Sequence, residues 1–192
     1  LGASGSVKSA EIVRDVLADG VGPDEPALLA LLWAMGRLPA VDGTELVLAQ
    51  YGKRSSVAGP LATLILGNHG SADRLPELAG LVHGPRRELA AAALLALGSA
   101  LPRHAATAQG EQGRRFLRAH LGHVALVNDP TRQAAALWAL AASGAGASSA
   151  EDAVPLLLQA SLSLQQPTMV RMALVLAGSP PPRLTLPLIA VG

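Results

Sequence analysis

The chain contains no cysteine, and only 2% of its 192 residues are aromatic. Without cysteine it cannot form a disulfide, use a thiolate nucleophile or hold zinc through sulfur ligands. A sheet protein would be expected to carry more tyrosine, phenylalanine, isoleucine and threonine. The apolar half of the composition is instead mainly alanine, leucine and valine, and the first two are strong helix formers. The composition therefore predicts an all-α fold.

The sequence also lacks an excess of one charge and a long apolar run. Its 15 lysines and arginines against 14 acidic residues give a formal net charge of +1, which favours neither a nucleic-acid binder nor an acidic tail. The longest apolar runs, 89–101 and 134–142, are shorter than the roughly 18–20 residues that cross a bilayer. We expect no transmembrane segment and no signal peptide. Localisation stays unknown from these features, with the cytoplasm favoured unless the chain carries lipid.

Glycine and proline divide the sequence at helical intervals. Ser6 is predicted to cap the first helix, and "DGTE" has capping-box spacing, with Asp42 as the cap and Glu45 reaching back. The helices fall into similar pairs, which is typical of repeat proteins. The predicted repeats are approximately 6–38, 42–70, 72–100, 113–144 and 151–180, with the start of another at 183. We therefore expect one domain over 1–192, an α-solenoid of about five antiparallel helix pairs and a segment of a longer chain.

The stretch "GPRRELAAAALLALGSALP" (84–102) predicts a helix with almost no polar face. In stacked helix pairs, the second helix of each pair contacts its partner and both neighbouring repeats, so it is apolar all round. The first helix of each pair keeps charged residues, such as Lys8 and Glu11. Trp33 and Trp138 lie in sequences of the second kind, and we expect both to pack in the core.

The paired frame carries a resemblance to a known family. "LVNDPTRQAAALWALAASG" and "QQPTMVRMALVLAGSP" place a proline before the second helix and an arginine soon after it, and other pairs carry a proline inside the first helix. This frame resembles HEAT repeats over nearly the whole chain, and it implies a HEAT-like α-solenoid that binds partners. Three segments, "GASGSVKSAEIVRDVL", "RRELAAAALLALGSALPRHA" and "MALVLAGSPPPRLTLPLI", are also similar to the helical superhelix of vitellogenin-type large lipid-transfer proteins. That likeness implies a wall beside a lipid cavity.

Two histidines are weak candidates for a metal site. His120 and His123 lie three residues apart on a predicted helix, so both imidazoles could face one metal ion. The chain has no cysteine to join them, and the same helix face has no acidic residue. The pattern therefore favours two solvent-facing side chains over a site.

Arg114, Arg115 and Arg118 form a possible basic interaction patch on the same predicted helix. HEAT-like repeats can bind a nucleic-acid backbone along such a face, as in the alkylpurine DNA glycosylases that this frame resembles. A groove that follows phosphates is expected to be richer in cations and in stacking aromatics than this one, where only Phe116 interleaves the arginines. A solvated outer face is the favoured interpretation, and nucleic acid is an unlikely partner.

No enzyme motif is present: the sequence contains neither G-x-S-x-G nor H-E-x-x-H, and no glycine-rich loop leads into Lys-Ser or Lys-Thr. We therefore predict no catalytic residue and no cofactor. The main hypothesis is a non-enzymatic scaffold that binds a protein partner. The alternative is the helical superhelix domain of a lipid-binding or lipid-transfer protein, and a nucleic-acid-binding repeat protein ranks below both.

Overall fold

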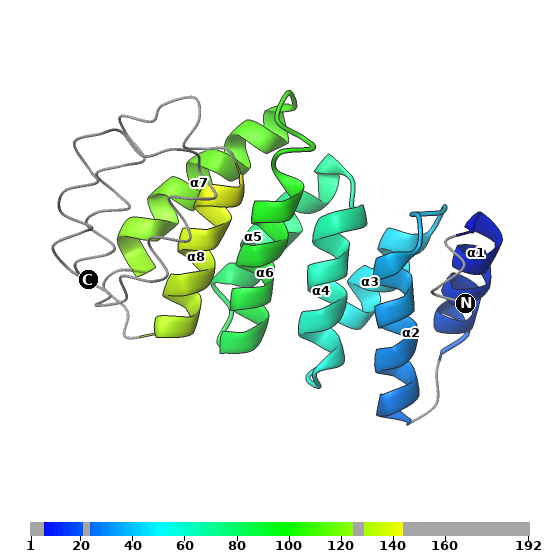
Figure 1. The fold of residues 1–192 in the computed structure, drawn as a ribbon. Helices are drawn as coiled ribbons and strands as arrows, with labels where there is room; N and C mark the ends of the chain where they lie inside the picture. Colours follow the sequence, from blue (N-terminus) through cyan, green and yellow to red (C-terminus); the bar gives the residue numbers. More distant parts are fainter. Residues whose placement is uncertain (1–5, 21–23, 125–128, 144–192) are drawn as a thin grey trace, which may run out of the picture.

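The computed structural model describes residues 6–20, 24–124 and 129–143, and within these ranges the chain folds entirely into helices and their connections (Figure 1). This confirms the predicted all-α class. The predicted repeat at 151–180 and the start at 183 lie outside the described residues. The helices are α1 (Val7–Ala18), α2 (Glu25–Arg37), α3 (Thr44–Gly52), α4 (Ala58–His69), a short 3-10 helix η1 (Ala72–Arg74), α5 (Leu75–Val82), α6 (Arg87–Ala100), α7 (Ala108–Val124) and α8 (Pro130–Ala142).

The helices are arranged in two layers (Figure 1). In the even layer, α2 packs against α4, α4 against α6, and α6 against α8. The odd layer contains α1, α3, α5 and α7, and each of these helices packs against the even helix that follows it in the chain. Consecutive helices therefore form pairs, and successive pairs lie next to one another.

Glycines allow the even helices to approach closely. Gly36, Gly67 and Gly98 recur at an interval of 31 residues, each near the end of an even helix. A Cβ at Gly67 would lie 2.6 Å from the carbonyl oxygen of Ala96, and one at Gly98 would lie 2.6 Å from the Cα of Ala139. Since both contacts join the C-terminal halves of two helices, α4, α6 and α8 run parallel, with their backbones almost touching.

Helix α6 is buried on nearly every side, as its sequence predicts. Ten of its fourteen residues are buried, because the helix contacts α4 and α8 in its own layer and α5 in the other. The run Ala90–Ala93 belongs to this buried set. Alanine side chains fill the narrow space between closely spaced helices without forcing them apart.

The expectation that Trp33 packs in the core is wrong. Helix α2 buries Leu28, Leu32 and Met35, which share one side of the helix, and Trp33 lies on the opposite side with 61% of its surface exposed. Trp138 is half-buried, because its ring packs over α6 at Gly98. Both tryptophans lie in apolar segments that form even helices, α2 and α8. The packing of the neighbouring helices decides which side of each helix is buried.

The predicted Ser6 cap is confirmed, since the Ser6 hydroxyl accepts a hydrogen bond of 3.1 Å from the Ser9 amide. The predicted capping box is wrong. Gly43 stands before α3 with a φ of 82°, a conformation that glycine adopts without strain, and α3 therefore begins one residue later than the pattern requires. The Glu45 carboxylate turns away from Asp42 and accepts a hydrogen bond of 3.0 Å from the Ser71 amide instead.

Candidate interaction surface

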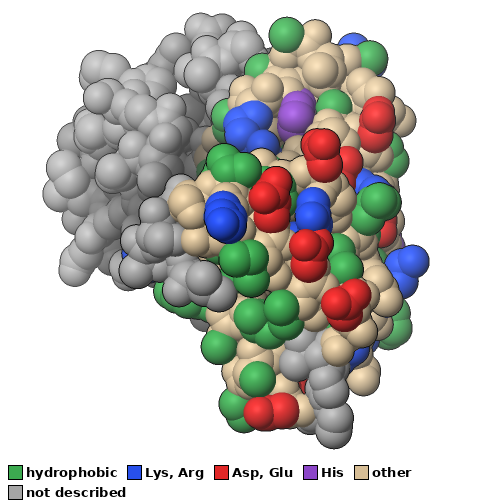
Figure 2. Space-filling view, turned by 90° about the vertical axis from the view of Figure 1, so that its right-hand side faces the viewer, with side chains coloured by type: hydrophobic (Ala, Val, Ile, Leu, Met, Phe, Trp, Pro, Cys, Tyr) green, Lys and Arg blue, Asp and Glu red, His purple; other side chains and the backbone are tan. Residues whose placement is uncertain are grey.

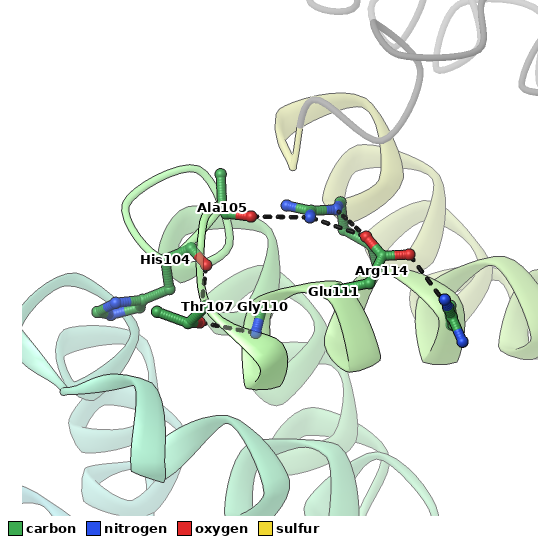
Figure 3. A network of polar contacts seen from close by, with 7 residues as sticks. His104, Ala105, Thr107, Gly110, Glu111 and Arg114 are labelled. Carbon is green, nitrogen blue, oxygen red and sulfur yellow. Dashed lines mark hydrogen bonds and ion pairs between the residues drawn. The ribbon is translucent and has the colours of Figure 1, made fainter.

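Two of the three arginines of the predicted basic patch on α7 pair with one acidic residue, Glu111. Glu111 lies 2.9 Å from the Arg114 guanidinium and 3.1 Å from that of Arg115 (Figure 3). Hydrogen bonds from Arg114 and then Arg115 hold the pKa of the Glu111 carboxyl below its usual value. The Arg114 side chain is only 14% exposed, and Arg118 is half-buried. The three arginines therefore do not form a continuous positive surface.

Arg114 instead holds the loop that leads into α7. Its guanidinium donates a hydrogen bond of 2.9 Å to the Ala105 carbonyl (Figure 3). In the same loop the Thr107 hydroxyl donates to the His104 carbonyl at 2.8 Å and accepts from the Gly110 amide at 3.0 Å. These contacts fix the loop against the first turn of α7, which gives Arg114 a structural role.

The same loop also covers the C-terminal end of α4. Arg103 donates to the Gly67 carbonyl, and the His104 ring lies 3.0 Å from the Gly70 carbonyl oxygen. The last carbonyls of a helix lack partners within the helix, so N–H donors from outside the helix satisfy them. Two more of the basic side chains in this region are thus used by the fold.

Charges of both signs are mixed at the opposite end of the molecule. Figure 2, a view onto the end where α1 lies, shows acidic, basic and hydrophobic side chains interleaved. On α1, Arg14 and Asp15 form an ion pair at 2.6 Å, and the same helix also carries the exposed apolar side chains of Val7, Ile12 and Val16. Among the side chains coloured in Figure 2, the basic ones form no continuous stripe of the kind that a nucleic-acid backbone requires.

His120 is buried, with 5% of its surface exposed, so the solvent-facing interpretation is wrong for this residue. Its ring stacks on Phe116 with centroids 5.5 Å apart, and His83 from the end of α5 meets it edge-on at 5.1 Å. Because α7 packs against α5, the α7 face that carries these rings turns inward. The side chain of His123 lies outside the described residues. No local pattern indicates that His83 would meet His120, since only the fold brings α5 beside α7.

A cavity of about 210 Å³ lies between α5 and α7, next to Phe116. Its wall is apolar apart from two glutamine amides, and its volume is below the roughly 300–1,000 Å³ of pockets that hold drug-sized ligands. A cavity of this size accommodates a single side chain. Its lining residues are Leu75, Pro76, Ala79, Gln109, Gln112, Gly113 and Phe116.

The even layer presents an apolar surface on the side away from the odd layer. Trp33 is the most exposed residue of this surface, and the others are half-buried leucines and a tryptophan on α4, α6 and α8. Leu61 and Leu64 lie on one side of α4, and the residues on its other sides are buried against α3 and the neighbouring even helices. We name this set the apolar face: Trp33, Leu61, Leu64, Leu95 and Trp138.

The apolar face is free of charged residues along the middle of its helices. Between their first and last turns, the described side chains of α2, α4 and α6 include no lysine, arginine, aspartate or glutamate. Arg37 and Glu88 mark the ends of α2 and α6. Apolar side chains that stay partly exposed on one side of a helix layer are typical of interaction sites in proteins.

His69 lies where α2 and α4 meet, at the last residue of α4. Its imidazole is hydrogen-bonded to the Gly36 carbonyl, and its Nε2 is buried without a hydrogen-bond partner among the described residues. Burial lowers the pKa of His69, and the nearby Arg103 charge lowers it further, while the bond to Gly36 acts in the opposite direction.

We expect the protein to lose stability when the pH falls below about 6.5, and His69 to cause part of that loss. The folded-state pKa of His69 is below its unfolded value of about 6.5, so the unfolded chain takes up the proton first. The stabilisation is complete above that value and is lost as the pH falls towards the folded pKa. Thermal unfolding between about pH 7.5 and 5.5 should show a smaller decrease in Tm for His69→Gln than for the native chain. An identical decrease in both proteins would contradict this role.

Comparison of the chain with protein-family models, with curated proteins and with solved structures gives no match. Among the helices that the structure describes, none is both long enough and apolar enough to span a membrane. The described residues also contain no group of three or more histidine, aspartate or glutamate side chains placed to hold one metal ion.

Proposed function

We propose that this chain is a non-enzymatic, HEAT-like α-solenoid scaffold that binds a protein partner along the apolar face. The observation that carries the proposal is the exposure of Trp33, at 61%, in a layer whose other large apolar side chains are buried or half-buried. Tryptophan is among the residues that contribute most to binding energy at protein interfaces. A solvent-exposed tryptophan beside half-buried leucines has the composition of an interface core.

The arrangement of the helices supports the solenoid part of the proposal. Consecutive helices pack in pairs, and the close contacts of the even layer recur with the interval of 31 residues. Four even helices at a usual spacing of 8–10 Å give a surface roughly 25–30 Å long. A partner segment of several turns or an extended peptide could contact all four helices at once.

The apolar face also supports the alternative that the chain belongs to a lipid-binding protein, because a wall beside lipid needs the same absence of charge. The nucleic-acid alternative has less support, since Glu111 pairs with two of the three predicted arginines. The two remaining functions differ in what touches Leu64: a polypeptide in one case and an acyl chain in the other.

Photo-crosslinking in the cells that produce the protein distinguishes these functions. A photoreactive amino acid replaces Leu64 on the apolar face, and in a control it replaces Leu46, which is 64% exposed on α3 in the other layer. A discrete protein adduct at position 64 but not at position 46 supports the scaffold. A lipid adduct at position 64 supports the alternative, and equal labelling at both positions excludes the apolar face as the binding surface.

Replacing Trp33 by alanine is expected to weaken partner binding strongly while leaving the fold unchanged. Loss of an interface tryptophan costs about 2 kcal/mol or more, or roughly a 30-fold rise in Kd. The free energy of unfolding should change by less than about 0.5 kcal/mol, because the side chain is mostly exposed. Affinity measured with the crosslinked partner, with Leu46→Ala as the matched control, checks the prediction. Equal binding by Trp33→Ala and the native chain would exclude Trp33 from the interface.

A further inference from the structure

Two exposed charges flank the apolar face. Arg37 lies in the last turn of α2, four residues after Trp33, so the two side chains share one side of the helix. Glu88 lies in the first turn of α6, seven residues before Leu95, and shares a side of that helix with the leucine. No ion pair joins either charge to another of the described residues. The apolar face therefore has one positive and one negative charge beside it.

The direction of the even helices puts these two charges on opposite edges of the face. Helix α2 runs parallel to α4, because Gly36 near its end lies close to Ile65 in the C-terminal half of α4. Since α4 and α6 are also parallel, Arg37 lies at the edge where the even helices end, and Glu88 at the edge where they begin. Helix α4 stands between α2 and α6 (Figure 1), so the line from Glu88 to Arg37 is a diagonal across α4.

This diagonal has the length and the tilt of a packed helix. At a usual interaxial distance of about 8–10 Å, the axes of α2 and α6 are roughly 16–20 Å apart. The contacts of Gly36 with α4 and of Gly67 with α6 place Arg37 roughly seven to ten residues beyond Glu88 along the helix direction, or about 10–15 Å. The diagonal is therefore about 20–25 Å long, which is the length of a helix of about 15 residues. It crosses α4 at about 55°, close to the roughly 50° that is common between packed helices.

The chemistry of the face favours a helix over an extended peptide. Leu61 and Leu64 lie near the middle of α4, where the diagonal crosses it, and Trp33 lies next to the Arg37 end. Apart from the indole N–H, these side chains offer no hydrogen bond. An extended peptide laid across them would bury backbone N–H and C=O groups without partners, which costs free energy. A helix bonds those groups within itself and presents only side chains to the face.

The two charges also select the direction of such a helix. The first turn of a helix has unpaired N–H groups and partial positive charge, whereas the last turn has unpaired carbonyls and partial negative charge. The Glu88 carboxylate therefore favours the N-terminus of a bound helix, and the Arg37 guanidinium favours its C-terminus. The opposite direction would place charges of like sign together at both ends.

We propose that the apolar face binds one amphipathic α-helix of a protein partner, about 15 residues long, with its N-terminus at Glu88 and its C-terminus at Arg37. This inference rests on the proposed function, since it names what the scaffold binds. The apolar stripe of the partner helix has the spacing i, i+3, i+4 and i+7 that is typical of helices bound to apolar surfaces. It covers Leu61, Leu64 and Trp33.

The test uses two displayed libraries of peptides of about 18 residues, each selected on the full chain. One library fixes leucines at helical spacing and the other fixes them at alternate positions, and all remaining positions vary. We expect binders from the helical library. Their Kd should be at least about tenfold higher for Trp33→Ala than for the control Leu46→Ala, whose side chain is exposed on α3 in the other layer.

The outcomes separate this inference from the proposed function. Binders from the alternating library that depend on Trp33 would keep the apolar face as the binding surface and overturn the helix. Binders that are unaffected by Trp33→Ala would contradict both the helix and the apolar face. Absence of binders from both libraries would overturn the helix, and the crosslinking experiment at Leu64 would still decide the proposed function.

A photoreactive benzophenone at either end of a selected peptide reports the direction of the bound helix, because mass spectrometry maps the adduct. We expect the N-terminal label to react with α6 near Glu88 and the C-terminal label with α2 near Arg37. Exchanging the two charges, Arg37→Glu together with Glu88→Arg, should reverse this direction. Lys8→Glu, at an exposed position on α1, is the matched control and should leave it unchanged. Labels that stay in place after the exchange would overturn the assigned direction.

Discussion

Replacing Gly67 by alanine is expected to lower the free energy of unfolding by about 3 kcal/mol. The new Cβ would lie 2.6 Å from both the Cβ and the carbonyl oxygen of Ala96, so it would meet backbone that belongs to the next even helix. Helices α4 and α6 would have to separate along one of the closest contacts in the structure. The gain of about 1 kcal/mol that alanine normally gives within a helix is too small to compensate.

Two other glycines provide matched controls for this substitution. Gly80 in α5 is exposed, and a Cβ there would have no atom within 4 Å, so Gly80→Ala should stabilise the protein by up to about 1 kcal/mol. A Cβ at Gly36 would lie 3.1 Å from the flexible Ile65 side chain. The stability of Gly36→Ala should therefore lie between those of Gly67→Ala and Gly80→Ala. Urea unfolding of the three variants measures the order of their stabilities. Equal stabilities of Gly67→Ala and Gly80→Ala would show that α4 and α6 are farther apart than described.

Replacing Asp129 by alanine is expected to cost about 3–5 kcal/mol. Its buried carboxylate accepts a hydrogen bond of 3.1 Å from the Arg132 amide at the start of α8, which gives it the role of a helix cap. The same carboxylate lies 3.6 Å from the Arg132 guanidinium, whose side chain is only 15% exposed. Removing the carboxylate leaves that charge buried without its counter-ion, and this penalty is larger than the loss of the cap.

Variants at the same site separate the two contributions. Asp129→Asn keeps an oxygen for the cap but removes the charge, so it should lose less stability than Asp129→Ala. Arg87 lies 3.9 Å from Asp129 with its side chain 71% exposed, and Arg87→Ala should cost no more than about 1 kcal/mol. Denaturant unfolding measures the loss of stability in Asp129→Ala, Asp129→Asn and Arg87→Ala. A loss for Arg87→Ala as large as that for Asp129→Ala would show that the buried pair with Arg132 is not the dominant interaction.

Local sequence patterns predicted where most of the helices lie and that α6 is buried on nearly every side. Helix starts and ends follow from capping residues and from glycine, whose effects act within one turn, as the Ser6 cap demonstrates. The burial of α6 follows from a run of alanine and leucine that has no polar side to turn towards water. The capping box at Asp42 failed because Gly43 adopted a left-handed conformation and Ser71, from another helix pair, offered Glu45 a different donor.

The sequence by itself determined that the chain is helical and where most of its helices lie, because hydrogen bonds within a helix and its caps depend on residues a few positions apart. Only the tertiary structure decided that Trp33 is exposed, that Glu111 pairs with both Arg114 and Arg115 on the same helix, and that the His83 ring contacts the His120 ring. Each outcome depends on which neighbours cover a helix face and on which rotamers that packing allows. Contacts between residues far apart in the chain have no local pattern from which they could be predicted.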